Sequence, residues 1–268
     1  MKYANFLNFN DYFYPTKQKT VKKFLLILLS LFLWVYFVVS SLILTPIGIL
    51  IKVLTYIPDR NLRILSKFSC FWGAQYIWVI PIWRLKIIDR NKIDDRKVQI
   101  LVSNHQSLAD ILVMNSLFKH FRWTSKVENF RIPLVGWTLW LNRSIKIYRG
   151  AADAWHRFEA QAVKVLSDGD PILMFAEGTR SKNGEMGKFK EGAFRLALQT
   201  KTDITPIVLD GTSKAIPKSG WILTGRQDML VKVLDPLPYK SFKDLTPAQL
   251  TEKVHGIIEN ALNEIRSK

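Results

Sequence analysis

Cysteine is nearly absent from this sequence, because Cys70 is the only one among 268 residues. A single cysteine excludes a disulfide within the chain, and no group of cysteine and histidine residues has the spacing of a zinc site. Both features fit a reducing compartment. Cys70 lies in an apolar stretch, so we interpret it as a buried and inert thiol.

Acidic residues are also few. The sequence has 22 Asp and Glu against 39 Lys and Arg, which gives a formal net charge of +17. A charge of this size favours an anionic partner, either a nucleic acid or an anionic lipid surface. The sequence contains no recognised nucleic-acid-binding module, so we expect no nucleic acid partner.

One long stretch lacks charge altogether. It runs from Phe24 to Leu44, and its apolar character continues past Pro46 to Ile51. About 20 apolar residues are enough to cross a bilayer. The run is too long for the core of a signal peptide and no clear small-residue cleavage site follows it, so we expect it to remain in the protein.

The flanks of this run leave two membrane arrangements open. Basic residues lie on both sides of it, namely Lys17, Lys19, Lys22, Lys23, Lys52, Arg60, Arg63 and Lys67. Because positive charge prefers the cytoplasmic side, these flanks favour a segment that enters and returns, with a bend at Pro46 and Gly48. A second apolar stretch, residues 62–82, is then a helix in the membrane interface, antiparallel to the first. The alternative is a plain transmembrane anchor followed by a soluble helix.

From residue 84 on, short apolar runs alternate with helical patterns. The pattern predicts strands at 98–103, 145–148, 172–176, 204–209 and 229–234, and helices at 107–119, 152–166 and 191–199. Thr246-Pro247-Ala248-Gln249 predicts a last helix that begins with a capping box. We therefore expect an α/β domain over residues 84–268, with a mostly parallel central sheet flanked by helices, after an N-terminal membrane-anchoring helical segment over residues 1–83.

His105 and Asp110 follow the first predicted strand of this domain. Residues five apart on a regular helix point about 140° from each other, so the two side chains would not meet in mid-helix. Ser107 and Asp110, however, have capping-box spacing. If Ser107 is the N-cap, His105 lies in the preceding loop, and its ring can fold back towards Asp110.

A neutral imidazole with a pKa of about 6.5 accepts a hydroxyl proton at neutral pH. A carboxylate on its other nitrogen fixes the tautomer and stabilises the imidazolium. The nucleophile would then be the hydroxyl of a substrate. The alternative is that Asp110 only caps the helix and that His105 is an ordinary loop residue, because an isolated spacing of this kind arises often by chance.

Two motifs in order decide between these interpretations. Asn104-His105-Gln106-Ser107-Leu108-Ala109-Asp110 and Phe175-Ala176-Glu177-Gly178-Thr179-Arg180-Ser181 resemble the N-H-x4-D and E-G-T-R motifs of the PlsC-type 1-acyl-sn-glycerol-3-phosphate (lysophosphatidic acid) acyltransferases. Weaker matches are the stretch 126–136 and Thr205-Pro206-Ile207-Val208. The block 143–149 departs from the pattern, since Arg143 replaces the usual Gly and Lys146 the usual Phe, which leaves the acceptor in doubt. The resemblance covers about residues 95 to 215.

The resemblance implies a role for each of these residues. His105 is the general base and Asp110 its partner. Arg149 and Arg180, with a contribution from Lys126, hold the phosphate of a lysolipid, a task for which the planar guanidinium is suited. Gly178 lets the chain turn sharply and bring Thr179 and Arg180 to the edge of the sheet, and Glu177 orients this loop or an arginine. The basic tract 182–190 is a solvated loop that, beside Arg180, would help to attract an anionic substrate.

The implied reaction moves a fatty acyl chain from acyl-CoA or acyl-carrier protein to the sn-2 hydroxyl of lysophosphatidic acid in phospholipid synthesis. It requires no metal and no bound cofactor, only the lysophospholipid acceptor and the acyl thioester donor. Backbone amides near the helix start or the Gly178 loop are candidate donors to the oxyanion. Anionic membrane lipids are the expected surroundings, on the cytoplasmic face of a bacterial inner membrane.

Two other functions remain possible on the sequence. One is the same chemistry on another lysolipid, such as lysophosphatidylglycerol, lysocardiolipin or a lyso-aminolipid. The other is a non-enzymatic basic protein that binds the membrane surface. His120, His156 and His255 have no partner at motif spacing, and we interpret each as a surface or structural residue.

Overall fold

The computed structural model describes residues 16–150, 152–181, 184–216 and 221–267. Two helices come first, α1 (Thr16–Leu54) and α2 (Arg63–Trp78). The remaining elements alternate along the chain: β1 (Trp83–Ile88), η2 (Arg90–Lys92), β2 (Gln99–Ser103), α3 (Ala109–Asn115), β3 (Arg122–Lys126), η3 (Val127–Arg131), α4 (Val135–Leu141), β4 (Ile145–Ile147), α5 (Ala154–Ser167), β5 (Ile172–Phe175), α6 (Gly192–Thr200), β6 (Asp203–Asp210), β7 (Gln227–Val233), η4 (Tyr239–Ser241) and α7 (Pro247–Arg266).

The strands form one seven-stranded sheet in the order β1-β7-β6-β2-β5-β3-β4. Only the pair β6 and β7 is antiparallel, so the prediction of a mostly parallel sheet is confirmed. The five strands predicted from the sequence are present. Strands β1 and β3 were not predicted, because basic and polar residues interrupt their apolar pattern and weaken the strand signal.

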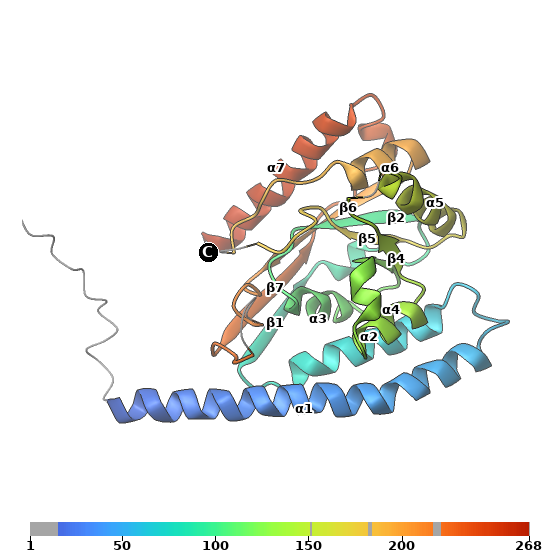
Figure 1. The fold of residues 1–268 in the computed structure, drawn as a ribbon. Helices are drawn as coiled ribbons and strands as arrows, with labels where there is room; N and C mark the ends of the chain where they lie inside the picture. The colour runs from blue at the N-terminus through green and yellow to red at the C-terminus, as the bar shows by residue number, and fades with distance from the viewer. Residues whose placement is uncertain (1–15, 151, 182–183, 217–220, 268) are drawn as a thin grey trace, which may run out of the picture.

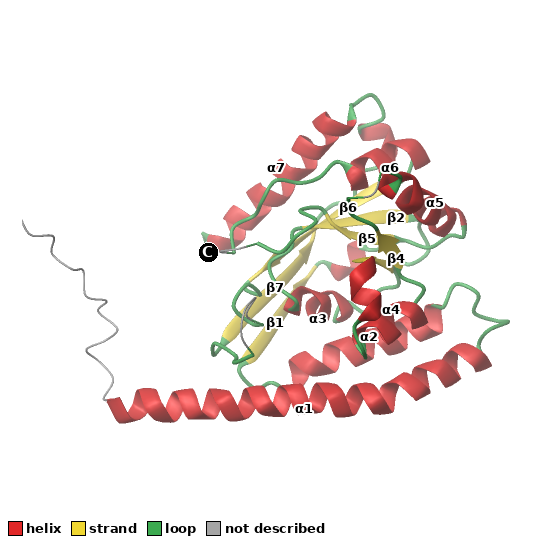
Figure 2. Cartoon of the chain, viewed as in Figure 1, coloured by secondary structure: helices red, strands yellow, loops and turns green. Residues whose placement is uncertain are grey.

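Helices cover both faces of the sheet (Figures 1 and 2). On one face α5, α6 and α7 pack over the side chains of Ile100, Val102 and Ile172. On the other face α2 and α3 pack over Leu101, Leu173 and Ile207. Successive residues of a strand point to opposite faces, so the continuous apolar run of β2 supplies both cores.

The predicted capping box of the last helix is present, because the Thr246 hydroxyl accepts from the Gln249 amide and the Gln249 side chain accepts from the Thr246 amide. The helix predicted over 107–119 is shorter than expected. It ends at Asn115, and Phe118 adopts a left-handed conformation with φ of 54°. The division of the chain at residue 83 remains a prediction, and it falls where β1 begins.

Helix α1 is continuous through Pro46 and runs along the side of the molecule, with α2 returning antiparallel beside it (Figure 1). It is the one helix among the described residues that is long and apolar enough to cross a membrane. Its inner side carries buried hydroxyls, of Ser30, Ser40, Ser41 and Thr45, whereas its outer side exposes large apolar side chains from Phe24 to Leu54.

Polar contacts fasten α1 to its neighbours. The Tyr36 hydroxyl donates to Gln75 Oε1 at 2.7 Å, and Ser40 Oγ lies 2.9 Å from the Tyr76 hydroxyl, both on α2. In its first half, α1 accepts the Leu223 amide at Ser30 Oγ, and near its end Lys52 Nζ donates to the Leu141 carbonyl at the end of α4. The helix is therefore bound to the sheet domain at Ser30 and near its C-terminal end.

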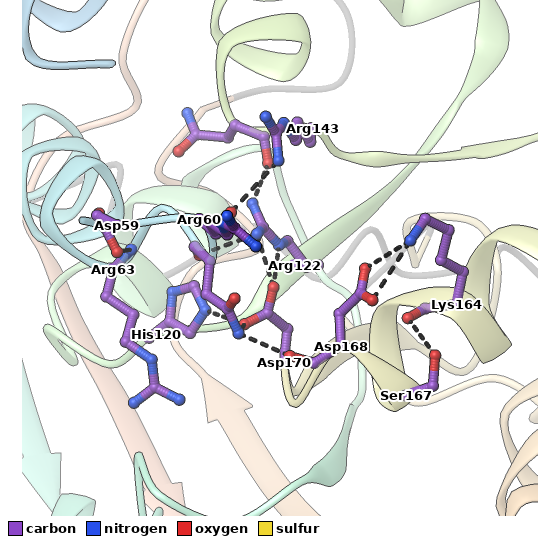
Figure 3. Close-up of polar contacts among 12 residues, drawn as sticks. Asp59, Arg60, Arg63, His120, Arg122, Arg143, Lys164, Ser167, Asp168 and Asp170 are labelled. Carbon is purple, nitrogen blue, oxygen red and sulfur yellow. Dashed lines mark hydrogen bonds and ion pairs between the residues drawn. The ribbon is translucent and has the colours of Figure 1, made fainter. Parts of the chain in front are cut away.

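A buried ion cluster joins this helical pair to the sheet (Figure 3). Arg122, the first residue of β3, donates to Asp170 Oδ2 from Nε at 2.9 Å and from Nη2 at 2.6 Å. His120 Nε2 lies 2.9 Å from Asp170 Oδ1. The same guanidinium donates to the carbonyls of Asn61, in the α1–α2 turn, and Asn142, after α4. The Asp170–Arg122 ion pair therefore connects four segments: the α1–α2 turn, the start of β3, the end of α4 and the turn before β5.

Replacing Asp170 by alanine leaves Arg122 and His120 buried without their carboxylate. We expect the free energy of unfolding at pH 7 to fall by about 3–5 kcal/mol in urea titrations. Asp168→Ala is the matched control, because the Asp168 side chain is 50% exposed and forms its ion pair with Lys164, whose side chain is 74% exposed. This control should change stability by less than about 1 kcal/mol.

The stabilisation that Asp170 provides depends on pH. Burial alone would raise the pKa of Asp170, but the hydrogen bonds and charges of His120 and Arg122 outweigh it and lower the pKa. The stabilisation is therefore complete above the unfolded value of about 3.9 and is lost as the pH falls through the lower folded value. The gap between wild type and Asp170→Ala should close in acid, and a gap that stays constant would contradict this assignment.

Candidate functional site

Three loops meet at one edge of the sheet. Ser103, at the end of β2, is in register with Phe175 at the end of β5 and with Ile207 in β6. Because these strands are parallel, the chain leaves β2 and β5 on the same edge, and β6 ends there three residues later. His105 and Glu177 each lie two residues beyond their aligned strand ends, so the register alone brings the two predicted motifs together.

His105 and Asp110 are in contact, as the sequence predicts. His105 Nδ1 lies 2.7 Å from Asp110 Oδ2. The same oxygen accepts the backbone amides of Gln106 at 2.6 Å and Ser107 at 2.9 Å, and the Thr212 hydroxyl donates to Oδ1. The Asp110 side chain is 0% exposed, so its charge is held entirely by these four groups.

The expected cap at Ser107 is present in part. Helix α3 begins at Ala109 with Leu108 in the cap position, but Ser107 Oγ accepts the Ala109 amide at 3.3 Å and donates to the Ile216 carbonyl at 3.0 Å. The Asp110 carboxylate, from the first turn, accepts the amides of Ser107 and of Gln106 before it, and the bond from Ser107 is the one that a capping box requires. This arrangement folds the loop so that His105 lies beside Asp110.

Phe175 fixes the plane of the imidazole. Its ring stacks on that of His105 with centroids 4.0 Å apart and an interplanar angle of 9°. With Nδ1 donating to a carboxylate, the neutral ring carries its lone pair on Nε2. No described residue forms a hydrogen bond with Nε2, and the His105 side chain is 15% exposed. The site therefore presents one oriented, accessible acceptor nitrogen.

Glu177 orients the backbone of the same loop. Its Oε1 accepts the His105 amide at 2.7 Å, and its Oε2 accepts the Gly187 amide at 3.0 Å. Burial raises the pKa of Glu177, although these two amide hydrogen bonds oppose the shift. The Ser181 amide donates to the His105 carbonyl at 2.8 Å, so the two motif loops are also joined through their main chains.

Gly178 turns the second loop with φ of 64°, a conformation that favours glycine. A Cβ atom at this position would lie 3.1 Å from Lys190 Cδ, so the lysine stem packs closely on the glycine. The Arg149 guanidinium donates to the Gly178 carbonyl. Thr179 is exposed at the tip of the loop, and Arg180 is half-buried beside it.

Four cations gather beside these loops. Burial lowers the pKa of Lys126, and the nearby charges of Arg149, Arg180 and Lys190 lower it further, while Glu128 opposes them. The structure thus brings Lys126, Arg149 and Arg180 together, as the sequence predicts. Lys190 was not singled out within the basic tract 182–190, whose residues 182–183 lie outside the described part of the chain. Such a cluster is suited to bind an anion with more than one charge.

Three of the candidate oxyanion donors are already engaged. The amides of Gln106 and Ser107 donate to Asp110, and the Gly178 amide donates to the Phe175 carbonyl. These three backbone groups support the loops, so the prediction narrows to the other amides of the same two segments.

Two further residues hold the loops: Asn104, which belongs to the first motif but for which the sequence predicts no role, and Thr212, which the sequence does not single out. The Asn104 side chain donates to the Leu209 carbonyl and accepts the Leu209 amide, both at 2.8 Å, and so extends the pairing of β2 with β6. Thr212 lies two residues beyond the end of β6 and donates to Asp110. Thr212 could have been identified by its position in the chain, because it follows the end of a predicted parallel strand, as His105 does.

The residues that sequence analysis set aside lie elsewhere. His120 is buried in the ion cluster of Figure 3, His156 is exposed on α5, and His255 lies 3.9 Å from Glu259 on α7. Cys70 is buried, and burial raises the pKa of its thiol to about 12, which fits the prediction of an inert residue. Within the described ranges, no group of three or more His, Cys, Asp or Glu residues is arranged to hold a metal ion.

Comparison with known proteins places this geometry in a family. Residues 84–210 match the model of the Acyltransferase family. The chain is 30% identical over 215 residues to a 1-acyl-sn-glycerol-3-phosphate acyltransferase of Limnanthes douglasii, covering 79% of this chain and 75% of the relative. It is 31% identical over 211 residues to an acyltransferase of the same name from Chlamydomonas reinhardtii, covering 76% of this chain.

The fold also has a close counterpart. The crystal structure of the 1-acyl-sn-glycerophosphate (LPA) acyltransferase PlsC from Thermotoga maritima matches with a TM-score of 0.76 at 20% identity, over 93% of this chain and 98% of that one. This likeness establishes the architecture, including the helical pair before the sheet. The chain spans 62% of the length of the Chlamydomonas relative, less than two thirds of it.

Proposed function

The chain belongs to the Acyltransferase family, with PlsC-type 1-acyl-sn-glycerol-3-phosphate acyltransferases among its relatives, and we propose that it transfers a fatty acyl chain from a thioester to the hydroxyl of a lysophospholipid. The observation that carries this proposal is the pairing of His105 with the buried Asp110 beside a cluster of cations. This combination can deprotonate an alcohol that is attached to an anionic headgroup.

His105 acts as the general base in the proposed step. The acceptor hydroxyl gives its proton to Nε2 while its oxygen attacks the thioester carbonyl carbon. The tetrahedral intermediate collapses, the carbon–sulfur bond breaks, and the imidazolium returns the proton to the leaving thiolate. Asp110 holds Nδ1–H throughout and stabilises the charged ring. The reaction is balanced by the two substrates alone, acyl-CoA or acyl-carrier protein as donor and the lysolipid as acceptor.

We propose that the cations hold the acceptor's phosphate. Lys126, Arg149, Arg180 and Lys190 repel one another in the absence of an anion, and a phosphate monoester with nearly two negative charges would relieve this repulsion. Lysophosphatidic acid is the lysolipid with such a headgroup. Its glycerol hydroxyl lies a few bonds from the phosphate, so a bound phosphate keeps that hydroxyl near His105.

A second acceptor class is favoured by one region of the chain. The departures from the family pattern, Arg143 and Lys146, lie around β4. Arg143 occupies a left-handed conformation with φ of 48°, where the family pattern has glycine. Lys146 Nζ lies 4.2 Å from the centre of the Trp140 ring and 5.3 Å from that of Phe130, in place of an aromatic side chain. The Arg143 guanidinium donates to the Arg60 carbonyl in the α1–α2 turn. Because the corresponding block of the family helps to hold the acceptor, its departure here makes lysophosphatidylglycerol, lysocardiolipin or another lysolipid the alternative acceptor.

We propose that the helical pair lies in one leaflet, on the cytoplasmic face of a membrane, and does not span it. Helix α1 exposes apolar side chains on its outer side and is bound through its inner side to α2 and to the loop that contains Leu223. A spanning helix would have to leave this polar inner side in the hydrocarbon region, where unpaired hydroxyls are costly. An in-plane arrangement also keeps His105 close to lipid substrates.

Replacing His105 by alanine tests the catalytic proposal. Loss of the general base should reduce acyl transfer to a lysolipid by at least about a hundredfold, measured with purified enzyme and labelled acyl-CoA. Membrane association, measured by fractionation, should persist. His156→Ala is the control, because His156 is exposed on α5. Unchanged transfer by the His105→Ala enzyme would eliminate the mechanism and favour a non-enzymatic lipid-binding protein.

Replacing Arg180 by alanine tests the phosphate site. The KM for lysophosphatidic acid should rise by about tenfold or more, because charge-assisted hydrogen bonds contribute about 1.5–3 kcal/mol each. Monoacylglycerol, which has no phosphate, should show no such rise. The control is Arg195→Ala, whose guanidinium pairs with exposed Glu191 on α6. The same assays with lysophosphatidylglycerol and lysocardiolipin identify the preferred acceptor, and equal KM changes for all acceptors would contradict the assignment of Arg180.

Labelling of α1 in sealed vesicles tests the membrane arrangement. Lys23→Cys and Tyr56→Cys place thiols near the two ends of the apolar run, and both positions are exposed. An impermeant maleimide should label both from the same side. Cys70 gives little background because its thiol is buried with a pKa of about 12. Labelling of the two positions from opposite sides would show a spanning helix.

A further inference from the structure

The last turn of the C-terminal helix reaches the loops of the site through Arg266. Its Nη2 donates to the Gly184 carbonyl at 2.8 Å and to Asp210 Oδ1 at 3.0 Å, and Nε lies 3.2 Å from the same carboxylate oxygen. Its Nη1 donates to Glu185 at 3.1 Å. One guanidinium thus joins α7 to the loop after Arg180 and to the end of β6.

Gln106, the neighbour of His105, uses the same two acceptors. Its Nε2 donates to Asp210 Oδ1 at 3.2 Å and to the Gly184 carbonyl at 3.3 Å, while its Oε1 accepts the Thr212 amide at 3.3 Å. These partners fix the orientation of the amide, because exchanging its oxygen and nitrogen would place donors against donors and acceptors against acceptors. The position of Gln106 therefore depends on atoms that Arg266 holds.

The path from Gln106 to the catalytic pair is short. The backbone amide of Gln106 donates to Asp110 Oδ2, the oxygen that also binds His105. Thr212, which binds the Gln106 side chain, donates its hydroxyl to the other oxygen of Asp110. Both oxygens of the carboxylate are thus held by groups that depend on Gln106.

We propose that Arg266 is a positioning residue for the His105–Asp110 pair, so that docking of the C-terminal helix is required for full turnover. The inference rests on the proposed acyl transfer. Arg266 acts mainly through Asp210, whose side chain is 22% exposed, and only weakly through Glu185, whose side chain is 69% exposed. A less exposed ion pair is less screened by water and salt and holds its partners more firmly.

The direct test is Arg266→Met, which keeps much of the aliphatic stem and removes the guanidinium. We expect kcat for acyl transfer to fall by about tenfold per folded enzyme, because small displacements of a catalytic group are costly. The KM for lysophosphatidic acid should stay within about twofold, since the cation cluster is retained. Arg266→Lys should recover part of kcat through its remaining charge, but not all of it, because an ammonium lacks the planar fork.

Two control variants also remove a charged side chain, but at positions that do not hold Asp210 or Gln106. Glu185→Gln removes the exposed partner of the same guanidinium, and Arg226→Met removes an exposed ion pair with Asp228. Both should keep the wild-type kcat. If Arg266→Met does not fold, Asp210→Asn takes its place, because the asparagine can still accept from Gln106 but no longer holds Arg266 by charge.

The proton resonance of His105 Nδ1–H provides a readout independent of turnover. It should shift or broaden in Arg266→Met and remain unchanged in Glu185→Gln. Wild-type kcat together with an unmoved resonance in Arg266→Met would overturn the inference. An inactive wild-type enzyme with a resonance that does move would instead refute acyl transfer and leave the positioning role intact.

Discussion

The buried carboxylate of Asp110 is the interaction on which the site depends. A charge without solvent contact is tolerated only if its lone pairs are filled, and four donors fill them here. Three of these donors belong to the loop between β2 and α3, so satisfying the charge also folds that loop. The imidazole of His105 is thereby fixed before any substrate binds, with its plane set by Phe175. The contacts that satisfy the buried charge of Asp110 therefore also hold the imidazole of His105 in a fixed orientation.

The sheet supplies the second constraint. Parallel register places the ends of β2 and β5 side by side, and the loops that follow them carry His105, Arg180 and Lys190. Lys126 lies at the end of β3 and Arg149 follows β4, so the neighbouring parallel strands add two more cations at this edge. Glu177 and the Ser181 amide then lock one loop to the other through the backbone of His105. Like charges also lie close together here: burial lowers the pKa of Lys126 most, and the charges of Arg149, Arg180 and Lys190 lower it further. If the headgroup of the proposed acceptor binds these cations, its binding would also stabilise the folded site.

The helical pair before the sheet buries polar as well as apolar side chains. Tyr36 and Ser40 of α1 pair with Gln75 and Tyr76 of α2, while the outer side of α1 exposes large apolar side chains. An exposed apolar side of this kind is stable where the surroundings are lipid, as we propose for this helix. The Asp170 cluster connects the turn between the two helices to the sheet, as Figure 3 shows.

Local pattern determined a large part of this protein. Five strands, the α7 capping box, the apolar run of α1 and the contact of His105 with Asp110 could be predicted, because each depends on residues close together in the chain. Ser107 caps α3 only in part, because Asp110 binds the loop amides more completely. The contacts of Thr212 with Asp110 and of Arg266 with Asp210 could not be predicted, and neither could the pairing of His120 and Arg122 with Asp170. These partners lie tens of residues or more apart in the chain, and only strand order and helix packing bring such groups within hydrogen-bond distance.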